Sequence, residues 1–240
     1  MQPEILRNLL PAIPGRKNPA DQAEMVTQLL YGEGFEVLER QEKWVHVRTQ
    51  IDQYECWLDH RQVAEAGPWE EAPHVLIAPA AAPPLMQVPL IYAGSRLTDA
   101  EMESLHDQQL LPIRYWAEQW LGAPYLWGGR TIAGVDCSGF VQVIYGVRGV
   151  SLPRDAWQQA ERGELVSFVD ACENGDLAFF DNTEGRITHV GLVIKASTGM
   201  RIIHASGKVR WDMLDHQGIF DEDAQQYTHK LRTIRRITAQ

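Results

Sequence analysis

Asp136-Cys137-Ser138-Gly139-Phe140 is the stretch from which the fold of this chain can be worked out. After the cysteine, apolar residues recur at spacings of three and four, which is typical of a helix: Phe140, Val141, Ile144 and Tyr145. Asp136 is a suitable N-cap, so Cys137 falls in the first helical turn. A thiol at that end of a helix can have its pKa lowered from about 8.5 toward ~4 to 7, and the thiolate is the reactive form. We interpret Cys137 as a candidate nucleophile; the alternative is a buried small hydrophobe.

Two later segments predict a β-hairpin that contains two histidines. Residues 188–194 and 201–206 have the composition of strands, and Ser197-Thr198-Gly199 between them is a turn signal. With the turn centred there, His204 is a diagonal neighbour of His189 on the same sheet face. A helix-N-terminal cysteine followed by two such histidines can supply a nucleophile, a base and an orienting group. Alone, His189 would be interpreted as a hydrogen-bonded core histidine.

Several motifs together resemble the NlpC family of bacterial cell-wall cysteine peptidases. They lie between about residues 97 and 236, in the family's order and spacing: residues 121–142, Leu152-Pro153-Arg154-Asp155, Gly175-Asp176-Leu177, Thr188-His189-Val190-Gly191 and His204-Ala205-Ser206-Gly207. The resemblance implies a papain-like fold that cleaves peptidoglycan stem peptides, usually at the γ-D-Glu–diamino acid bond. It implies that Cys137 is the nucleophile, His189 the base and His204 the polar third member, with no metal and no organic cofactor.

The resemblance also implies substrate-binding residues close to the nucleophile. Asp136, besides capping the helix, would help to line the substrate pocket, and Ser138 would contact substrate or simply start the helix. Tyr125 and Trp127 would be walls of the cleft, with core packing as the alternative. Arg130 would contact substrate, or would be a solvated loop charge or a salt-bridge partner.

A second subsite is implied for a free N-terminal L-Ala on the substrate. Its ammonium would meet Asp155, which also has the position of a helix N-cap, and Tyr54, which has barrel packing as its alternative. A buried ammonium requires such charge-assisted partners. The chain departs from the family at Ala156, where a small hydroxyl residue is expected, and this removes one possible hydrogen bond.

The N-terminal part of the chain predicts a small all-β unit. We expect residues 1–14 to be an N-terminal extension and residues 15–77 to form an SH3-like barrel. Short strands are predicted at 35–38, 44–48 and 54–58, where apolar and polar residues alternate. The strand pattern is similar to the bacterial SH3-like barrels that accompany NlpC-type domains.

The rest of the chain predicts a linker followed by an α+β domain. Residues 78–96 are rich in Pro and Ala, so we expect a semi-rigid extended linker. Residues 97–240 would be the papain-like peptidase domain. A capping-box signature at 98–101 starts a helix that would run to about His106, and a second helix is predicted at 113–121. Helices first and antiparallel strands afterward indicate an α+β arrangement, with the nucleophile helix packed against the sheet.

Composition excludes several kinds of partner. The 240 residues have a net charge of −10, which argues against binding to nucleic acid and to anionic membranes. Three cysteines at wide spacing form no disulfide framework and no zinc motif, which suits a reducing compartment. The first residues lack the features of a secretion signal, so we expect the chain as given to be cytoplasmic.

These patterns predict a cysteine peptidase of cell-wall peptide recycling that acts on murein stem peptides with a free N-terminal L-Ala. Two alternatives remain. A papain-like acyltransferase or amidase could use the same Cys137, His189 and His204. A non-catalytic muropeptide-binding protein could retain the fold without the reaction.

Overall fold

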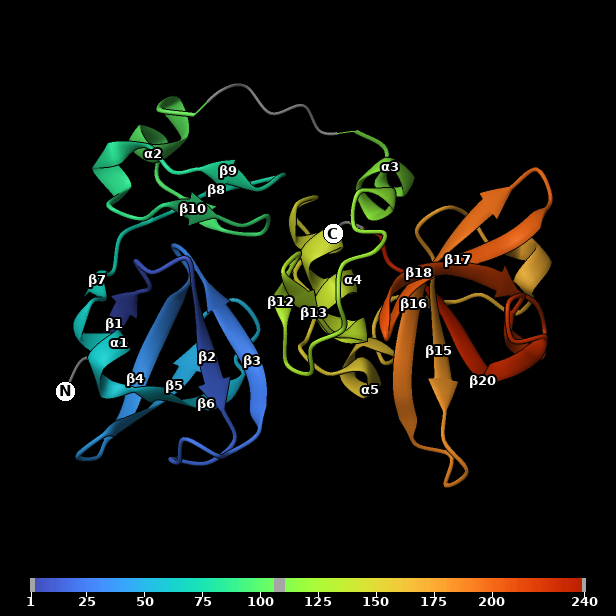
Figure 1. The fold of residues 1–240 in the computed structure, drawn as a ribbon, viewed down its shortest axis with the longest axis horizontal. Helices are drawn as coiled ribbons and strands as arrows, with labels where there is room; N and C mark the ends of the chain where they lie inside the picture. Colours follow the sequence, from blue (N-terminus) through green and yellow to red (C-terminus); the bar gives the residue numbers. More distant parts are fainter. Residues whose placement is uncertain (1–2, 106–110, 239–240) are drawn as a thin grey trace. The chain divides into compact units, whose positions relative to one another are not determined.

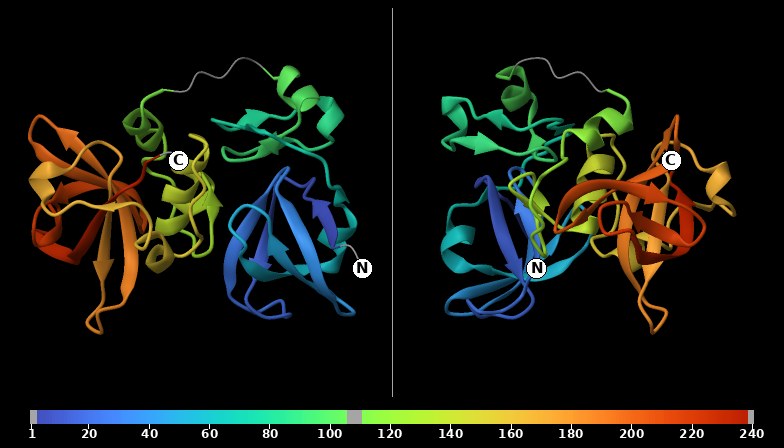
Figure 2. Two further views of the ribbon diagram at one scale, coloured as in Figure 1. Left: turned by 180° about the vertical axis from the view of Figure 1, so that it is seen from behind. Right: turned by 45° about the vertical axis from the view of Figure 1, so that its right-hand side comes forward.

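The computed structural model describes residues 3–105 and 111–238, which divide into two compact units (Figures 1 and 2). The first unit contains the chain up to Leu110, together with Trp127–Ile132 and Tyr145–Ser151. The second unit contains Leu111–Leu126, Ala133–Ile144 and Leu152–Gln240. Two short strands lie in the loop before the nucleophile: β12 (Arg130–Thr131) and β13 (Gly134–Val135).

The first unit is built on a seven-stranded antiparallel sheet with the order β3-β2-β6-β5-β4-β1-β7. Its strands and the helix after β6 are β1 (Glu4–Arg7), β2 (Ala12–Arg16), β3 (Met25–Leu30), β4 (Gly34–Arg40), β5 (Trp44–Thr49), β6 (Glu55–Asp59), α1 (His60–Ala64) and β7 (Gly67–Pro68). Alternate residues of the strands point inward, so Phe35, Val47 and Leu58 are fully buried in the barrel core. The strands predicted from alternation are confirmed.

Residues 1–14 differ from the prediction, because they add strands to the barrel and are not an extension outside it. β1 pairs antiparallel with β4, with Glu4 opposite Val37 and Leu6 opposite Phe35. The beginning of β2 pairs with β3. Four-residue β1 is too short to show the alternation by which a strand is recognised in sequence.

The segment 78–96 also differs from the prediction of an extended linker. It contains β9 (Ala80–Ala81), η1 (Pro84–Met86) and β10 (Leu90–Ile91), and β9 pairs with β10. Next to it, β8 (His74–Val75) pairs with β11 (Arg96–Leu97). These turns surround one buried cluster: Tyr31, Leu76, Met86, Ile91 and Leu97. The prolines prevent a helix, but the apolar residues between them are buried against the barrel end of the same unit.

Helix α2 (Asp99–Glu103) ends this part of the chain. Its N-cap is Thr98, and Glu101 completes the predicted capping box: Thr98 Oγ1 accepts from Glu101 N–H and Glu101 Oε2 accepts from Thr98 N–H. His106, the predicted end of this helix, lies outside the described residues.

The described residues of the second unit form three α-helices, one short 3₁₀ helix and a second seven-stranded sheet with the order β14-β20-β15-β16-β17-β18-β19. The helical elements are α3 (Ile113–Glu118), α4 (Cys137–Gly146), α5 (Ala156–Gln159) and η2 (Val169–Ala171). The strands are β14 (Glu164–Leu165), β15 (Leu177–Asp181), β16 (Ile187–Ala196), β17 (Gly199–Ser206), β18 (Lys208–Leu214), β19 (Gly218–Asp221) and β20 (Gln226–Arg236). An additional pairing of β19 with β20 closes the sheet on itself. Helices followed by antiparallel strands confirm the α+β prediction.

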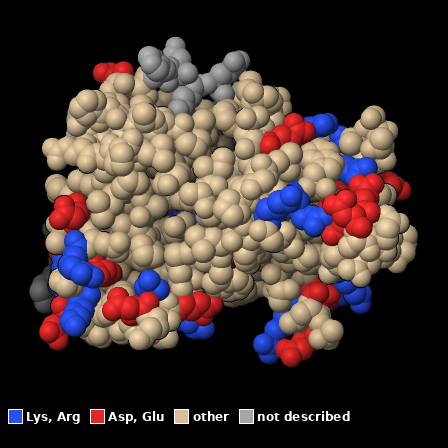
Figure 3. Space-filling model, viewed as in Figure 1, with Lys and Arg blue, Asp and Glu red and all other residues tan. Residues whose placement is uncertain are grey.

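The predicted histidine hairpin is the pair β16 and β17. Leu192 lies opposite Ile203 and Ala196 opposite Gly199, so the turn falls at the predicted place. Helix 113–121 is shorter than predicted and ends at Glu118. None of the helices in the described part of the chain is long and apolar enough to cross a membrane. Acidic and basic side chains are intermixed on the face shown in Figure 3.

Candidate active site

Cys137 is the first residue of α4, and Asp136 caps this helix as predicted. Asp136 Oδ1 accepts a hydrogen bond from Gly139 N–H at 2.7 Å. The thiol is buried, with 6% of the residue exposed. Burial and the negative charge of Asp136 raise the pKa of Cys137 to about 12, although N–H groups of Val190 and Ser138 and the charge of Arg154 act in the opposite direction. The prediction of a lowered pKa is therefore wrong for this thiol, because burial outweighs the helix end.

The hydrogen bond between Val190 N–H and the Cys137 sulfur places the thiol beside the strand that contains His189. His189 is also buried. Its pKa is well below the ordinary value, first because of burial and then because of the neighbouring His204 and His229. Burial thus favours the uncharged form of both the thiol and the imidazole.

His189 and His204 are hydrogen-bonded to each other across the hairpin. His189 Nε2 lies 2.8 Å from His204 Nδ1, and the two rings are nearly perpendicular. Gly191, between them on the same face, provides the space for this arrangement. A Cβ at Gly191 would lie 2.8 Å from the Cβ of His204 and 2.6 Å from Cδ1 of Ile202. The structure therefore brings together the two predicted histidines.

Two further residues join the site from the next strand, β18, and sequence analysis missed both. His204 Nε2 lies 2.8 Å from Asp212 Oδ2, and Arg210 Nη2 donates to Asp212 Oδ1 at 2.7 Å. Arg210 is directly opposite His204 in the β17–β18 pair. Asp212, two residues after Arg210, is therefore a diagonal neighbour of His204 on the same face. Burial raises the pKa of Asp212, but hydrogen bonds from His204 and Arg210 outweigh it and the net pKa is lowered. Their i, i+2 spacing puts both on one face of a strand, but nothing in the sequence of that strand shows the register that brings them to His204.

A third histidine, also missed, covers the ring of His189. His229 lies on β20, and its ring is stacked on that of His189 with centroids 4.2 Å apart and planes 26° apart. Burial, followed by the charge of His204, lowers the pKa of His229 to about 4. Among the residues described in this structure, no group of three or more His, Cys, Asp or Glu has the arrangement of a metal site.

A buried arginine connects the nucleophile loop to the segment before α5. Arg154 is 2% exposed, and its guanidinium donates to Asp136 Oδ1 at 3.1 Å, to Asp136 Oδ2 at 2.5 Å and to Ser138 Oγ at 2.8 Å. Asp136 and Ser138 thus have structural partners on both sides of Cys137. Burial, followed by the neighbouring Cys137 and Asp136, raises the pKa of Tyr125, which places this phenol near the nucleophile.

The remaining residues predicted to bind substrate belong to both units of the chain. Asp155 is the N-cap residue of α5, and its N–H donates to Gln158 Oε1 at 3.3 Å. Tyr54 and Trp127 belong to the first unit; Tyr54 is half-buried before β6 and Trp127 is 56% exposed.

Arg130, also in the first unit, is buried and forms a salt bridge, which corrects its assignment to the substrate site. Its Nη1 and Nη2 lie 2.7 and 2.8 Å from the two carboxylate oxygens of Glu33, and Nη1 also donates to Gln28 O at 2.7 Å. This buried bidentate pair is the salt-bridge alternative for Arg130.

Comparison with known proteins agrees with this geometry. The NlpC/P60 family matches residues 122–231, and the bacterial dipeptidyl-peptidase SH3 domain matches residues 15–63. The chain contains an NlpC/P60 domain. That domain includes Cys137, His189, His204 and Asp212, and the SH3 domain includes Tyr54.

The NlpC/P60 domain has curated relatives over part of their length. A γ-D-glutamyl-L-lysine dipeptidyl-peptidase of Bacillus subtilis is 46% identical over 87 residues, which are 35% of this chain and 28% of the relative. The protein of that name from Bacillus cereus is 34% identical over 109 residues, 45% of this chain and 32% of the relative. A probable endopeptidase NlpC of Escherichia coli is 43% identical over 91 residues, 37% of this chain and 56% of the relative. The matches thus span about a third to about half of these relatives.

A solved structure resembles the whole chain. The crystal structure of an NlpC/P60 family protein from Bacillus cereus has a TM-score of 0.74, with 97% of this chain and 99% of that chain covered. The identity is 18%, so this similarity shows the fold. It supports the prediction of an N-terminal SH3-like region followed by a papain-like domain.

Proposed function

We propose that the NlpC/P60 domain of this chain is a cysteine peptidase that hydrolyses the γ-D-Glu–diamino acid bond of peptidoglycan stem peptides. The observation that carries the proposal is the alignment of Cys137, His189 and His204. The thiol lies at the start of a helix beside the His189 strand, and His189 Nε2 is engaged by His204 at 2.8 Å. The other ring nitrogen of His189, Nδ1, is left to accept a proton from the thiol.

The reaction follows from these contacts. His189 Nδ1 takes the thiol proton as the Cys137 sulfur attacks the peptide carbonyl, and a tetrahedral oxyanion forms that still carries the leaving nitrogen. N–H groups at the beginning of α4, including that of Cys137, donate to this oxyanion. The protonated His189 gives its proton to the leaving amine. Water then hydrolyses the thioester, again with His189 as the base.

Because burial favours the uncharged form of both groups, we expect proton transfer to accompany the attack. This is general-base catalysis of a buried thiol, in which the substrate carbonyl supplies the driving force for the charge separation. Burial also excludes water from the thiol until the substrate is in place.

The substrate class is supported by the names of the Bacillus relatives, which are dipeptidyl-peptidases for γ-D-glutamyl-L-lysine. We propose that a free N-terminal L-Ala is read by Asp155. N-acetylation of L-Ala-γ-D-Glu-diaminopimelate should then prevent cleavage. Asp155→Asn should cost about 2 to 4 kcal/mol in kcat/KM for the free tripeptide and little for the acetylated one. Equal rates on the two peptides would exclude this specificity and leave the Cys–His chemistry intact.

Incubation with defined muropeptides in H2¹⁸O, followed by mass spectrometry, tests the activity. A peptidase incorporates ¹⁸O into the new D-Glu carboxylate, whereas an acyltransferase joins the acyl group to an added amine or alcohol. Cys137→Ala should abolish the reaction, and Cys172→Ala should retain it. If Cys137→Ala retains wild-type turnover, the nucleophile is wrong; if wild type binds muropeptides without converting them, the protein is a binding protein.

We also propose that small free muropeptides, as produced in cell-wall recycling inside the cell, are the preferred substrates. All three cysteines are free and buried, which is compatible with a reducing compartment. Purified sacculi should be solubilised far more slowly than tripeptides are cleaved. Efficient solubilisation, or recovery of the activity mainly from culture medium, would contradict this role.

A further inference from the structure

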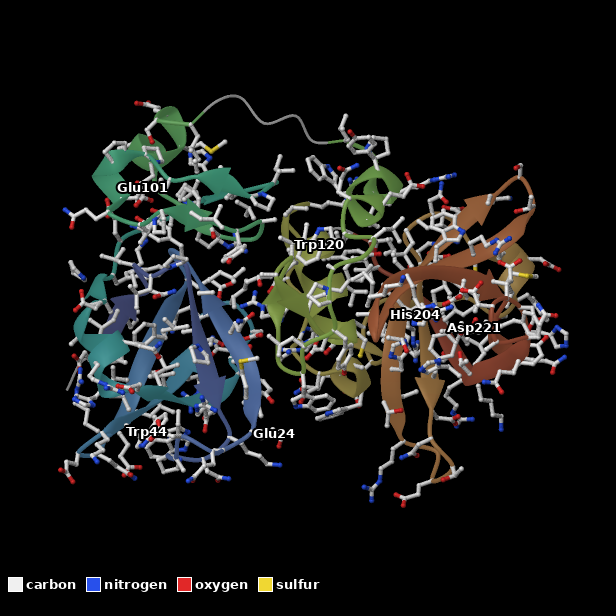
Figure 4. All side chains as sticks on the ribbon, in the orientation of Figure 1. Glu24, Trp44, Glu101, Trp120, His204 and Asp221 are labelled. Atoms are coloured by element: carbon white, nitrogen blue, oxygen red, sulfur yellow. The ribbon has the colours of Figure 1, made fainter. Side chains whose placement is uncertain are left out.

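A line of polar contacts continues from the two histidines through β18 to β19. His204 contacts Asp212, Asp212 contacts Arg210, and Arg210 Nη2 lies 3.0 Å from Asp221 Oδ2. Figure 4 labels the first and last members, His204 and Asp221. His204 and Asp212 are 1% and 3% exposed. No ring nitrogen of His204 therefore depends on bulk water for its hydrogen bond.

The direction of each hydrogen bond follows from the chemistry of Asp212. Its lowered pKa keeps it ionised at neutral pH, and an ionised carboxylate can only accept. His204 must therefore carry its proton on Nε2, which leaves Nδ1 as an acceptor. His204 Nδ1 in turn must accept from His189, so His189 carries its proton on Nε2. The unprotonated nitrogen of His189 is then Nδ1.

We propose that Asp212 is a positioning residue of this site, which sets the tautomer of His204 and through it that of His189, so that His189 offers an unprotonated Nδ1 to Cys137. The effect of Asp212 on catalysis rests on the proposed peptidase function, in which His189 is the base. Asp212 contacts neither the thiol nor, in this mechanism, the substrate. It acts two hydrogen bonds away from the base.

Arg210 orients the carboxylate of Asp212, which sets the two histidine tautomers. It donates to Asp212 Oδ1, and its Nε lies 2.6 Å from Oδ2, so the carboxylate plane is held with Oδ2 toward His204. Asp221 Oδ2 lies 3.0 Å from the same nitrogen, Nη2. The carboxylates thereby compensate the Arg210 charge, and Asp212 remains able to stabilise positive charge that develops on the two imidazoles.

Asp212→Asn tests this positioning role, because the asparagine side chain has the shape of the aspartate but can place a hydrogen-bond donor opposite His204 Nε2, where the carboxylate accepts. Arg210 Nη2 donates at the Oδ1 position, whereas Arg210 Nε lies near Oδ2 without a hydrogen bond. The amide oxygen is therefore held at the Oδ1 position, and the amide nitrogen takes the Oδ2 position. That nitrogen donates to His204 Nε2, which moves the His204 proton to Nδ1. His204 then donates to His189 Nε2, and the proton of His189 moves to Nδ1, where a base is needed.

Two-bond ¹⁵N–¹H NMR of the histidine rings measures the tautomers directly. In the wild-type protein we expect His189 and His204 both protonated on Nε2; in Asp212→Asn we expect both protonated on Nδ1. His189→Gln and His204→Gln variants assign the signals. A wild-type His189 protonated on Nδ1 would overturn the proposal by itself, whether or not any variant folds. Unchanged tautomers in a folded Asp212→Asn would also overturn it.

Kinetics provide the second measurement. Asp212→Asn should lower kcat by about 10²- to 10⁴-fold, the range of a misplaced general base, with KM unchanged. Asp212→Asn should also lower the rate at which iodoacetamide alkylates Cys137 at neutral pH. Asp215→Asn is the matched control: it removes a carboxylate after β18 that accepts from Tyr227 and from backbone N–H groups and whose histidine neighbour is His216, outside the site. It should leave tautomers, kcat and alkylation unchanged.

The outcomes separate this inference from the proposed function. If the tautomers are as expected but no stem peptide is hydrolysed, the proposed function fails and the role of Asp212 stands. If peptides are hydrolysed and Asp212→Asn has wild-type kcat, the role of Asp212 fails and the peptidase stands. A loss of activity explained by a lower fraction of folded protein, with kcat per folded molecule unchanged, would reduce Asp212 to a structural residue and contradict the proposal.

Discussion

The guanidinium of Arg154 donates to both carboxylate oxygens of Asp136, the residue that caps the helix beginning at Cys137. Both partners are almost fully buried. Asp136 is thus hydrogen-bonded both to the N-terminus of its helix and to Arg154, 18 residues later in the sequence. This pair fixes the position of the residue that precedes the nucleophile.

Loss of Arg154 should be costly, because it leaves the Asp136 charge buried without its cation. We expect Arg154→Met to lower the free energy of unfolding of the second unit by about 3 to 5 kcal/mol. Arg186→Met removes an exposed arginine that lies 3.5 Å from Glu184, and it should change stability by less than about 0.5 kcal/mol. Urea unfolding monitored by tryptophan fluorescence measures both. Equal effects would contradict the structural role of the buried pair.

The same reasoning applies to Arg130 and Glu33 in the first unit. Glu33→Gln should lower the stability of that unit by about 3 to 5 kcal/mol, because Arg130 keeps its charge and loses its bidentate partner. Glu36→Gln is the control, since Glu36 lies 3.4 Å from Arg48 at a half-exposed position. Glu36→Gln should change the free energy of unfolding by no more than about 1 kcal/mol. Chemical unfolding of the barrel distinguishes the two.

The labelling of Cys137 should depend strongly on pH. Burial raises its pKa to about 12, and only the thiolate reacts with iodoacetamide. We therefore expect the labelling rate of the resting protein to increase about tenfold per pH unit between about pH 6 and pH 9. A preformed thiolate–imidazolium pair would give a rate that is nearly constant over this range. Peptide mapping follows the reaction, with buried Cys56 and Cys172 as internal controls.

His229 should make the second unit sensitive to acid. Its pKa is about 4 in the folded protein and about 6.5 when unfolded, so the unfolded state binds the extra proton between these values. The stability is complete above about pH 6.5 and is lost as the pH falls toward 4. At pH 5 the loss from His229 is about 2 kcal/mol. His189, whose pKa is also lowered, contributes with the same sign.

His229→Gln tests this sign and size. The difference in unfolding free energy between about pH 7.5 and pH 5 should be about 2 kcal/mol smaller in His229→Gln than in the wild-type protein. His216→Gln, at an exposed position in the same unit, should leave the difference unchanged. An equal acid loss in His229→Gln and wild type would show that the stacked ring does not titrate on unfolding.

Gly191 should tolerate no side chain. In Gly191→Ala the new Cβ would overlap Ile202 and the Cβ of His204, and one of them must move. We expect a loss of about 1 to 3 kcal/mol in stability and a larger relative loss in kcat, because the His189–His204 contact is displaced. Gly146→Ala, at the end of α4 with nothing within 4 Å of the added Cβ, should be neutral or slightly stabilising. Similar effects of the two substitutions would contradict the packing argument.

The sequence by itself determined the elements that depend on local pattern. The helix at Cys137, its cap Asp136 and the β16–β17 hairpin follow from periodicity, capping preference and turn composition, all of which act over a few residues. The same local signals placed His189 and His204 on one face. They also identified the three main strands of the barrel.

Only the tertiary structure decided which distant groups complete the site. Asp212 and Arg210 reach His204 because β18 pairs with β17 in one register, and His229 reaches His189 because the sheet closes through β20. A hydrogen-bond partner that depends on strand register has no periodic signature in the sequence of its own strand.

Burial was the second property that the tertiary structure decided. Helix position alone predicts a lowered pKa for Cys137, but the desolvation of the thiol by residues far along the chain raises it. Likewise the prolines of residues 78–96 predict an extended chain, whereas Ile91 and Met86 are buried with Tyr31 and Leu76. Local sequence specifies conformation through short-range backbone preferences; solvent exclusion is a sum over neighbours that only folding brings together.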